Sequence, residues 1–114
     1  MYKQENEDAY LRKIPFLDGP NYVFWKFRME SYLMSLATNV SSSMLVDYTI
    51  TTNPPTDENG KKVYSNNVKA RNVILYGLSQ YELVKVMHYK WAKEVWENIN
   101  KIHQGNEKVR QAEL

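Results

Sequence analysis

Apolar side chains recur at helical spacing between Asn21 and Thr38, where the first clear element of the chain is predicted. One apolar stripe consists of Tyr22, Trp25, Met29, Tyr32, Leu33 and Leu36. Steps of three and four residues place these side chains on one face of an α-helix. A second apolar set, on the opposite side, consists of Val23, Phe24, Phe27 and Met34. A helix with two apolar faces is either sandwiched between other helices or presents one face to a partner, and we favour the sandwich.

The segment before this helix is predicted to be polar at first and extended afterwards. Residues 1–13 form a polar arm, and residues 14–114 are predicted to form one helical domain. Ile14 precedes a proline, which disfavours helical backbone, and the sequence DGPN at residues 18–21 is a turn signal.

The middle of the chain combines a weak helical pattern with a loop. The apolar residues that indicate a short helix, despite three serines, are Val40, Met44, Leu45 and Tyr48. Thr51–Lys61 is predicted to be a long surface loop because it contains Pro54, Pro55 and Gly60.

A long helix is predicted from Lys62 to Tyr76, and Gly77 is placed to end it. The residues on or near its inner face are Tyr64, Val68, Arg71, Leu75 and Leu78, with Ala70 and Ile74 adjacent. This register puts Val73 and Tyr76 on the side away from the apolar stripe.

The remaining sequence predicts two more helices. Ser79–Glu82 has the pattern of a capping box, which opens a short helix. Its inward side chains are expected to be Leu83, Val84 and Met87. The last complete helix is predicted at 91–104, with Ala92, Val95, Ile99 and Ile102 as its stripe and Trp96 on its flank. Gly105 is expected to end it. Residues 106–114 are expected to form only the beginning of a further helix.

These patterns together predict an all-α fold, a compact bundle of about five helices with a long central loop and a short extended N-terminal segment. The 114 residues suffice for one domain with its own core. The absence of cysteine excludes disulfides and thiolate metal sites and fits a cytoplasmic location. No apolar run is long enough to cross a membrane, so we expect no membrane partner.

The sequence offers little for catalysis, and we expect a protein that is not an enzyme and needs no cofactor or metal. Its two histidines, His88 and His103, are both predicted near helix ends, where the helix dipole favours them. No metalloprotease, nucleophile-elbow or phosphate-binding glycine pattern occurs.

Two kinds of binding surface remain open. Basic residues with neighbouring aromatics could contact single-stranded RNA weakly, and the candidates are Lys61, Lys62, Lys69 and Arg71. The net charge is only +2, so we prefer to regard these residues as a solvated face. Aromatic and apolar side chains away from the stripes could contact another protein, and the candidates are Phe24, Phe27, Val73, Tyr76 and Trp91.

The stretch IPFLDGPNYVFWKFRMESYLMSL resembles the opening of the Gag polypeptide of plant copia-type LTR retrotransposons. The residues that carry this resemblance are Phe16, Gly19, Asn21, Tyr22, Trp25, Met29, Tyr32 and Leu33. Later matches are Ile74, Leu75, Leu78, Val86, Ala92, Lys93, Glu94, Trp96, Ile99, Gly105, Val109, Ala112 and Leu114. The likeness covers residues 14–114, but the chain has VSSSM where the family usually has a Trp.

The resemblance implies a capsid N-terminal domain that associates weakly with copies of itself in virus-like particles around the element's RNA. It also implies that most of the RNA contact is made by regions outside this segment. Two alternatives stay open: a domesticated Gag-like module that binds a host protein, and an RNA-binding domain.

Overall fold

The computed structural model describes residues 13–36, 38–45, 48 and 53–113, and it describes their side chains except at 38, 39 and 106–113. This part of the chain contains five α-helices and no strand longer than one isolated β-bridge. The predicted all-α fold is therefore confirmed. The predicted N-terminal arm lies almost wholly outside the described residues, as do residues 51 and 52 of the predicted loop.

Helix α2, Tyr22–Leu36, begins where the aromatic pattern predicts it. The DGPN turn leads into it, with Gly19 at φ 115°, a conformation that favours glycine. Asn21 closes the turn, because its amide donates to the Phe16 carbonyl at 2.7 Å and accepts from the Asp18 N–H at 3.1 Å. The inner stripe of α2 is confirmed: Tyr22, Trp25, Met29 and Leu33 are buried.

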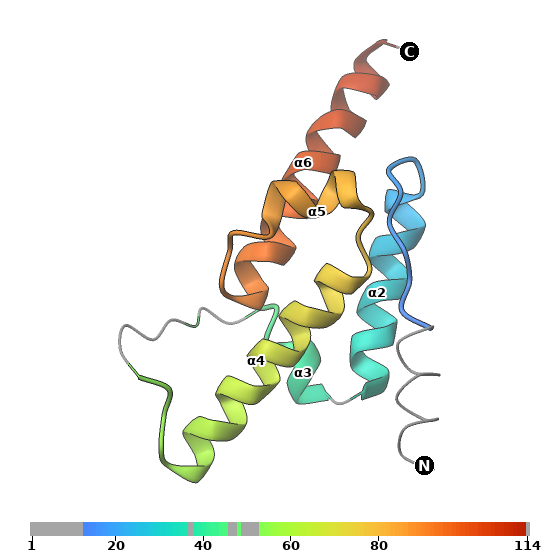
Figure 1. Cartoon of the computed structure of the whole chain (residues 1–114). Coiled ribbons are helices and arrows are strands. Elements are labelled where there is room, and N and C mark those ends of the chain that lie inside the picture. The colour runs from blue at the N-terminus through green and yellow to red at the C-terminus, as the bar shows by residue number, and fades with distance from the viewer. Residues whose placement is uncertain (1–12, 37, 46–47, 49–52, 114) are drawn as a thin grey trace.

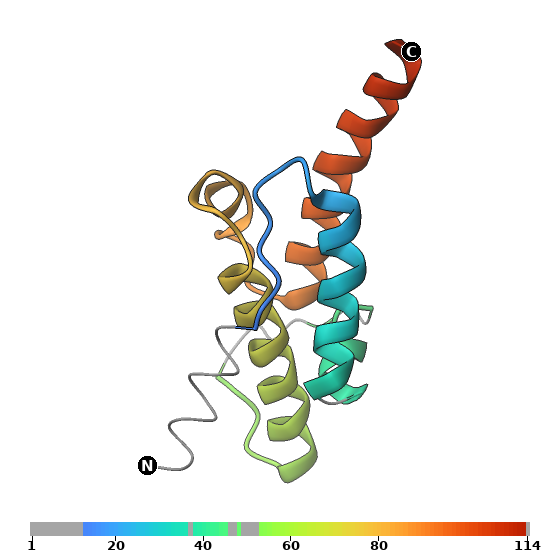
Figure 2. The same ribbon diagram turned by 90° about the vertical axis from the view of Figure 1, so that its right-hand side faces the viewer.

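The extended segment before α2 lies along the bundle between α2 and the α4–α5 region (Figure 2). Leu17 is fully buried and forms a parallel bridge with Leu78. Its N–H donates to the Gly77 carbonyl at 2.7 Å, and its carbonyl accepts from the Ser79 N–H at 3.0 Å. We call residues 14–18 the N-terminal strap, since they cross the link between two helices that come much later in the chain.

Helix α3, Thr38–Ser42, is short. Val40 and Met44 are buried as the pattern predicts, whereas Leu45 is exposed and Tyr48 lies beyond the helix. The helix gives way to a turn at residues 43–45. The three serines at 41–43 have a low helix propensity, which is consistent with its early end.

Helix α4, Glu58–Tyr76, begins four residues before the predicted start. Asp57 caps it, because its side chain accepts from the Gly60 N–H at 2.8 Å, so Gly60 belongs to the first turn and not to the loop. Gly77 ends the helix as predicted. Its inner face differs from the predicted one and consists of Asn67, Ala70, Val73 and Ile74.

Helix α5, Gln80–Val86, starts with the predicted Ser79 cap, whose hydroxyl accepts from the Glu82 N–H at 3.4 Å. The buried side chains are Glu82 and Val86. Leu83 is partly buried against the core as predicted, whereas the expected inward placement of Val84 and Met87 is wrong. The register differs because Glu82 turns inward to a buried partner on α6.

Helix α6, Ala92–Glu113, runs through Gly105, so the predicted end there is wrong. One of its first N–H groups is capped from α4, since the buried Asn67 side chain accepts from the Ala92 N–H at 3.0 Å. Gly105 has no neighbouring atom within 4 Å of where a Cβ would stand, and nothing there interrupts the helix. The C-terminal part of α6 extends past the rest of the bundle (Figure 1).

The core lies between α2, α4 and α6, and α3 and α5 close its sides (Figure 1). The rings of Trp25 and Trp96 meet at its centre, with centroids 5.5 Å apart. Trp96 is therefore a core residue as well as a residue on the flank of its stripe. Arg71 fastens the α5–α6 link to α4, because its guanidinium donates to the Tyr89 and Met87 carbonyls at 2.7 and 3.0 Å.

Candidate functional site

The side of α2 that faces away from the core carries four apolar side chains that no described residue covers, and Glu30 and Ser31 are exposed on the same side. We define the outer face of α2 as Val23, Phe24, Phe27 and Met34, all of which are exposed. Phe24 is 69% and Phe27 74% exposed, and the two rings stand about one turn apart. The opposite side of the same helix is buried in the core. The preferred prediction that α2 is sandwiched is therefore wrong, because its neighbours pack on one side only.

This face continues onto the N-terminal strap. Phe16 is also exposed, and it borders a hollow of about 230 Å³ together with Phe24 and Arg28. The result is a strip of phenylalanine rings with a guanidinium beside it. Exposed aromatics of this kind, next to an arginine, are enriched in the centres of protein interfaces.

The other interface candidates do not join this face. Val73 is only 3% exposed and belongs to the core, so its prediction as a surface residue is wrong. Tyr76 is exposed at the end of α4. Trp91 is half-buried before α6 and meets the Tyr48 ring edge-on, with centroids 5.1 Å apart.

A second exposed apolar group lies on α5 and was not predicted. It consists of Tyr81, Val84 and Met87. Lys85 lies over the Tyr81 ring with its Nζ 3.9 Å from the centroid, which covers part of this surface with charge. The step of three residues between its members is the signal that could have identified it.

The four predicted basic residues all lie on α4. Lys61, Lys62 and Lys69 are exposed. Arg71 differs, because its guanidinium donates to two backbone carbonyls of the α5–α6 link and so has a structural role.

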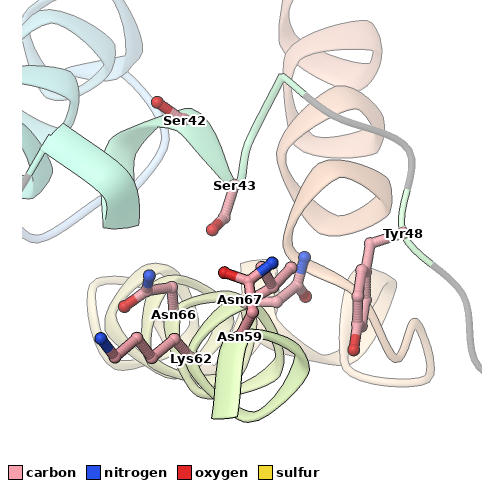
Figure 3. Close-up of a pocket in the computed structure, with 8 residues that line it drawn as sticks. Ser42, Ser43, Tyr48, Asn59, Lys62, Asn66 and Asn67 are labelled. Carbon is pink, nitrogen blue, oxygen red and sulfur yellow. The ribbon is translucent and has the colours of Figure 1, made fainter. Parts of the chain in front are cut away.

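A hollow of about 380 Å³ lies between the end of α3 and the N-terminal half of α4 (Figure 3). Its lining residues are Ser42, Ser43, Tyr48, Asn59, Lys62, Val63, Asn66 and Asn67. Burial raises the pKa of the Tyr48 hydroxyl, and Tyr64 and Asp57 add to the rise. That hydroxyl is buried and has no hydrogen-bond partner among the described residues. Most of the lining residues carry a hydroxyl or an amide group, although most of the surface that they expose to the hollow is apolar. Hydrophobic periodicity cannot reveal this feature.

A closed polar cluster ties α2, α5 and α6 together. His103 Nε2 lies 2.8 Å from Glu82 Oε1, and both side chains are buried. The Tyr22 ring stacks on the His103 ring at 4.8 Å, while its hydroxyl donates to Asn100 Oδ1 at 2.5 Å. His103 lies well inside α6, so its predicted place in a last helical turn is wrong.

This cluster has a structural role, since it links three helices through contacts among its own side chains. Its polar groups bind one another within the core, and Lys85 Nζ adds a contact to Glu82 at 3.6 Å. His88 is exposed after α5 and is not part of it. Among the described residues, no three His, Asp or Glu side chains are arranged to hold a metal ion. Nor does any described helix have the length and apolarity needed to cross a membrane.

Together these features define a small all-helical domain with a buried polar cluster, the exposed apolar outer face of α2 and a hollow between α3 and α4. A comparison with known families matches residues 29–114 to the family described as gag-polypeptide of LTR copia-type. The chain belongs to this family, whose domains are structural and not catalytic. No curated protein and no solved structure matches the chain. The match starts midway along α2 and includes α3 to α6.

Proposed function

We propose that this Gag domain associates weakly with copies of itself, through the outer face of α2, in building particles that enclose the RNA of the element. The observation that carries the proposal is the exposure of Phe24 and Phe27 on a helix already fixed from behind by Trp25 and Met29. Burial of such rings against a second copy removes apolar area from water, which favours association.

Each contact of this kind is small, so a single pair of domains binds weakly. A dissociation constant of about 1 mM corresponds to only about 4 kcal/mol. Repetition compensates, because linked contacts act at a high effective concentration and a regular arrangement closes into rings or shells. The fixed backbone of α2 suits this role, since little conformational freedom is lost when the face is covered.

Sedimentation velocity over a concentration series up to about 1 mM tests the proposal, because contacts of about 4 kcal/mol populate dimers in that range. We expect the sedimentation coefficient of the natural chain to rise with concentration. The double variant Phe24→Ser, Phe27→Ser should stay monomeric throughout, with unchanged helical circular dichroism.

The matched control is Val84→Ser, which removes an exposed apolar side chain from α5 instead of α2. It should associate like the natural chain. A natural chain that remains monomeric at every concentration would overturn the proposal, and so would an equal loss of association in the control. A domesticated module that binds a host protein is the alternative that a monomeric chain would leave standing.

A further inference from the structure

The exposed side of α4 differs in kind from the outer face of α2. We define the outer stripe of α4 as the exposed residues Lys62, Ser65, Lys69, Asn72 and Tyr76. Lys62, Lys69 and Tyr76 recur every seven residues, so they lie along one line on the helix. At 1.5 Å per residue this line is about 21 Å long.

The stripe is basic and contains no acid. Between Asn59 and Tyr76 the sequence has four basic residues and no Asp or Glu. Carboxylates occur only at the N-terminal end, where Asp57 is engaged as the helix cap and Glu58 occupies the first turn. Beyond that first turn, a polyanion that follows the stripe meets lysines and amides and no carboxylate of α4.

The hollow beside α4 opens along the same helix. Lys62 and Asn66 line this hollow, and they also line a second, shallower one of about 430 Å³ together with Lys61 and Ser65. The two hollows thus share an edge, along which Lys62 and Asn66 lie next to each other (Figure 3). Among the residues that the structure describes, no carboxylate lines either hollow. Amide and hydroxyl groups in such a recess can donate to and accept from the edge of an unstacked base.

The chemistry of the stripe favours RNA over the other partners. Protein interfaces are depleted of lysine at their centres, and the outer stripe of α4 has lysine at two of its five positions. A membrane surface requires a broad apolar face beside the basic one. On α4 the exposed large apolar side chains are Val63 and Tyr76, whereas Ala70, Val73 and Ile74 are buried in the core. Tyr76, 67% exposed, provides a ring on which a base can stack.

We propose that the outer stripe of α4 and the adjoining hollow bind single-stranded RNA directly. Lys61 and Lys62 contact phosphates, Asn66 hydrogen-bonds to a base held in the hollow, and Tyr76 stacks on another base. The site lies on a different helix from the outer face of α2, so it stands or falls independently of self-association. It gives this domain a part in RNA capture that does not depend on other regions of a Gag protein.

Fluorescence anisotropy with a labelled single-stranded RNA of about twelve nucleotides, a common site size for single strands, tests the site over a salt series. The double variant Lys61→Ala, Lys62→Ala should bind more weakly than the natural chain. Its plot of log affinity against log salt should be shallower by about 1.4, because each phosphate contact on a single strand contributes about 0.7.

Two uncharged changes separate base contacts from phosphate contacts. Asn66→Ala and Tyr76→Ala should each weaken binding and leave the salt slope unchanged. For Tyr76→Ala the loss should be about tenfold, the scale of one stacked base.

The charge-matched control is Lys90→Ala, Lys101→Ala, which removes two exposed lysines away from α4. It should keep the affinity of the natural chain within about twofold, since it removes no contact at the site. The proposal is overturned by an absence of binding at low salt, or by equal losses in the control. Equally tight binding of a duplex of the same length would also overturn it, because that would indicate charge attraction alone. The Lys61, Lys62 variant should sediment like the natural chain, which keeps this test separate from that of the α2 face.

Discussion

Trp25 and Phe27 are two residues apart on α2, yet they have opposite environments. Trp25 is 1% exposed, packs on Trp96, and donates from Nε1 to the Pro15 carbonyl at 3.2 Å. Phe27 points into solvent. The spacing of the apolar residues placed the two rings on opposite sides of the helix, because Trp25 shares its stripe with Met29 and Leu33. It could not decide whether the side that carries Phe27 is covered by other helices. The distinction decides which ring serves the fold and which is available to a partner.

Alanine at these two positions should therefore have very different effects. Trp25→Ala should lower the free energy of unfolding by about 3–5 kcal/mol, because it leaves a cavity beside Trp96 and removes a partly buried hydrogen bond. Phe27→Ala should change it by less than about 0.5 kcal/mol, as is usual for exposed positions. Urea denaturation followed by tryptophan fluorescence and by circular dichroism measures both. A loss under about 1 kcal/mol for Trp25→Ala would show that this ring is not part of the core.

At the level of the helices, periodicity predicted most of what the structure has. The helices at α2, α4, α5 and α6 were placed by their apolar stripes and by the caps at Ser79 and Gly77. The face of α4 was displaced by about 100°, one residue's rotation. The reason is that Asn67 is buried in order to cap α6, and a polar core residue does not contribute to a hydrophobic pattern.

The candidate surfaces were predicted less completely. Phe24, Phe27 and the lysines of α4 were identified, since exposure follows from the register of a single helix. Val73 was misplaced together with the face of α4. The hollow could not be predicted, because it requires α3 and Tyr48 to lie beside α4, a relation between distant segments. Glycine was also ambiguous: Gly77 ends a helix, but Gly60 and Gly105 lie inside helices.

The two glycines Gly105 and Gly77 should respond in opposite ways to alanine. Gly105→Ala should raise the free energy of unfolding by an amount on the order of 0.5–1 kcal/mol, because alanine favours helix over glycine by that much and the site has room for a Cβ. The helical content should also rise. Gly77→Ala should be destabilising, since its Cβ would stand 2.5 Å from the Pro15 carbonyl oxygen and from Met29 Cε. Thermal unfolding monitored at 222 nm measures both. A lower melting temperature for Gly105→Ala would contradict the continuous α6.

In the molecule as a whole, the segment around the start of α2 contacts residues from the second half of the chain. The N-terminal strap pairs with the α4–α5 link, and Tyr22 at the start of α2 joins His103 and Asn100 on α6. The part that matches the family begins only at Met29, so it omits the strap and the first two turns of α2. Those omitted residues nevertheless contribute Leu17, Tyr22 and Trp25 to the core.

Two truncated chains test whether the fold needs this N-terminal part. A chain of residues 14–114 should unfold cooperatively, because it retains the strap and the whole described core. A chain of residues 29–114 should lack a cooperative transition, since it loses three fully or nearly buried side chains that each contribute about 2–5 kcal/mol. Calorimetry of both measures the difference. A sharp transition in the shorter chain would show that the strap only decorates an independent bundle.

The bridge between Leu17 and Leu78 also bears on how the protein is made. A ribosome that adds about 5–20 residues each second finishes Leu78 some 3–12 s after Leu17. During that interval the strap cannot pair with Leu78, and Trp96 of α6 is not yet available to cover Trp25. Both aromatic sides of α2 are therefore exposed to solvent. The nascent domain is therefore most prone to aggregate before α4 and α6 emerge, and factors that shield apolar segments should bind it at that stage.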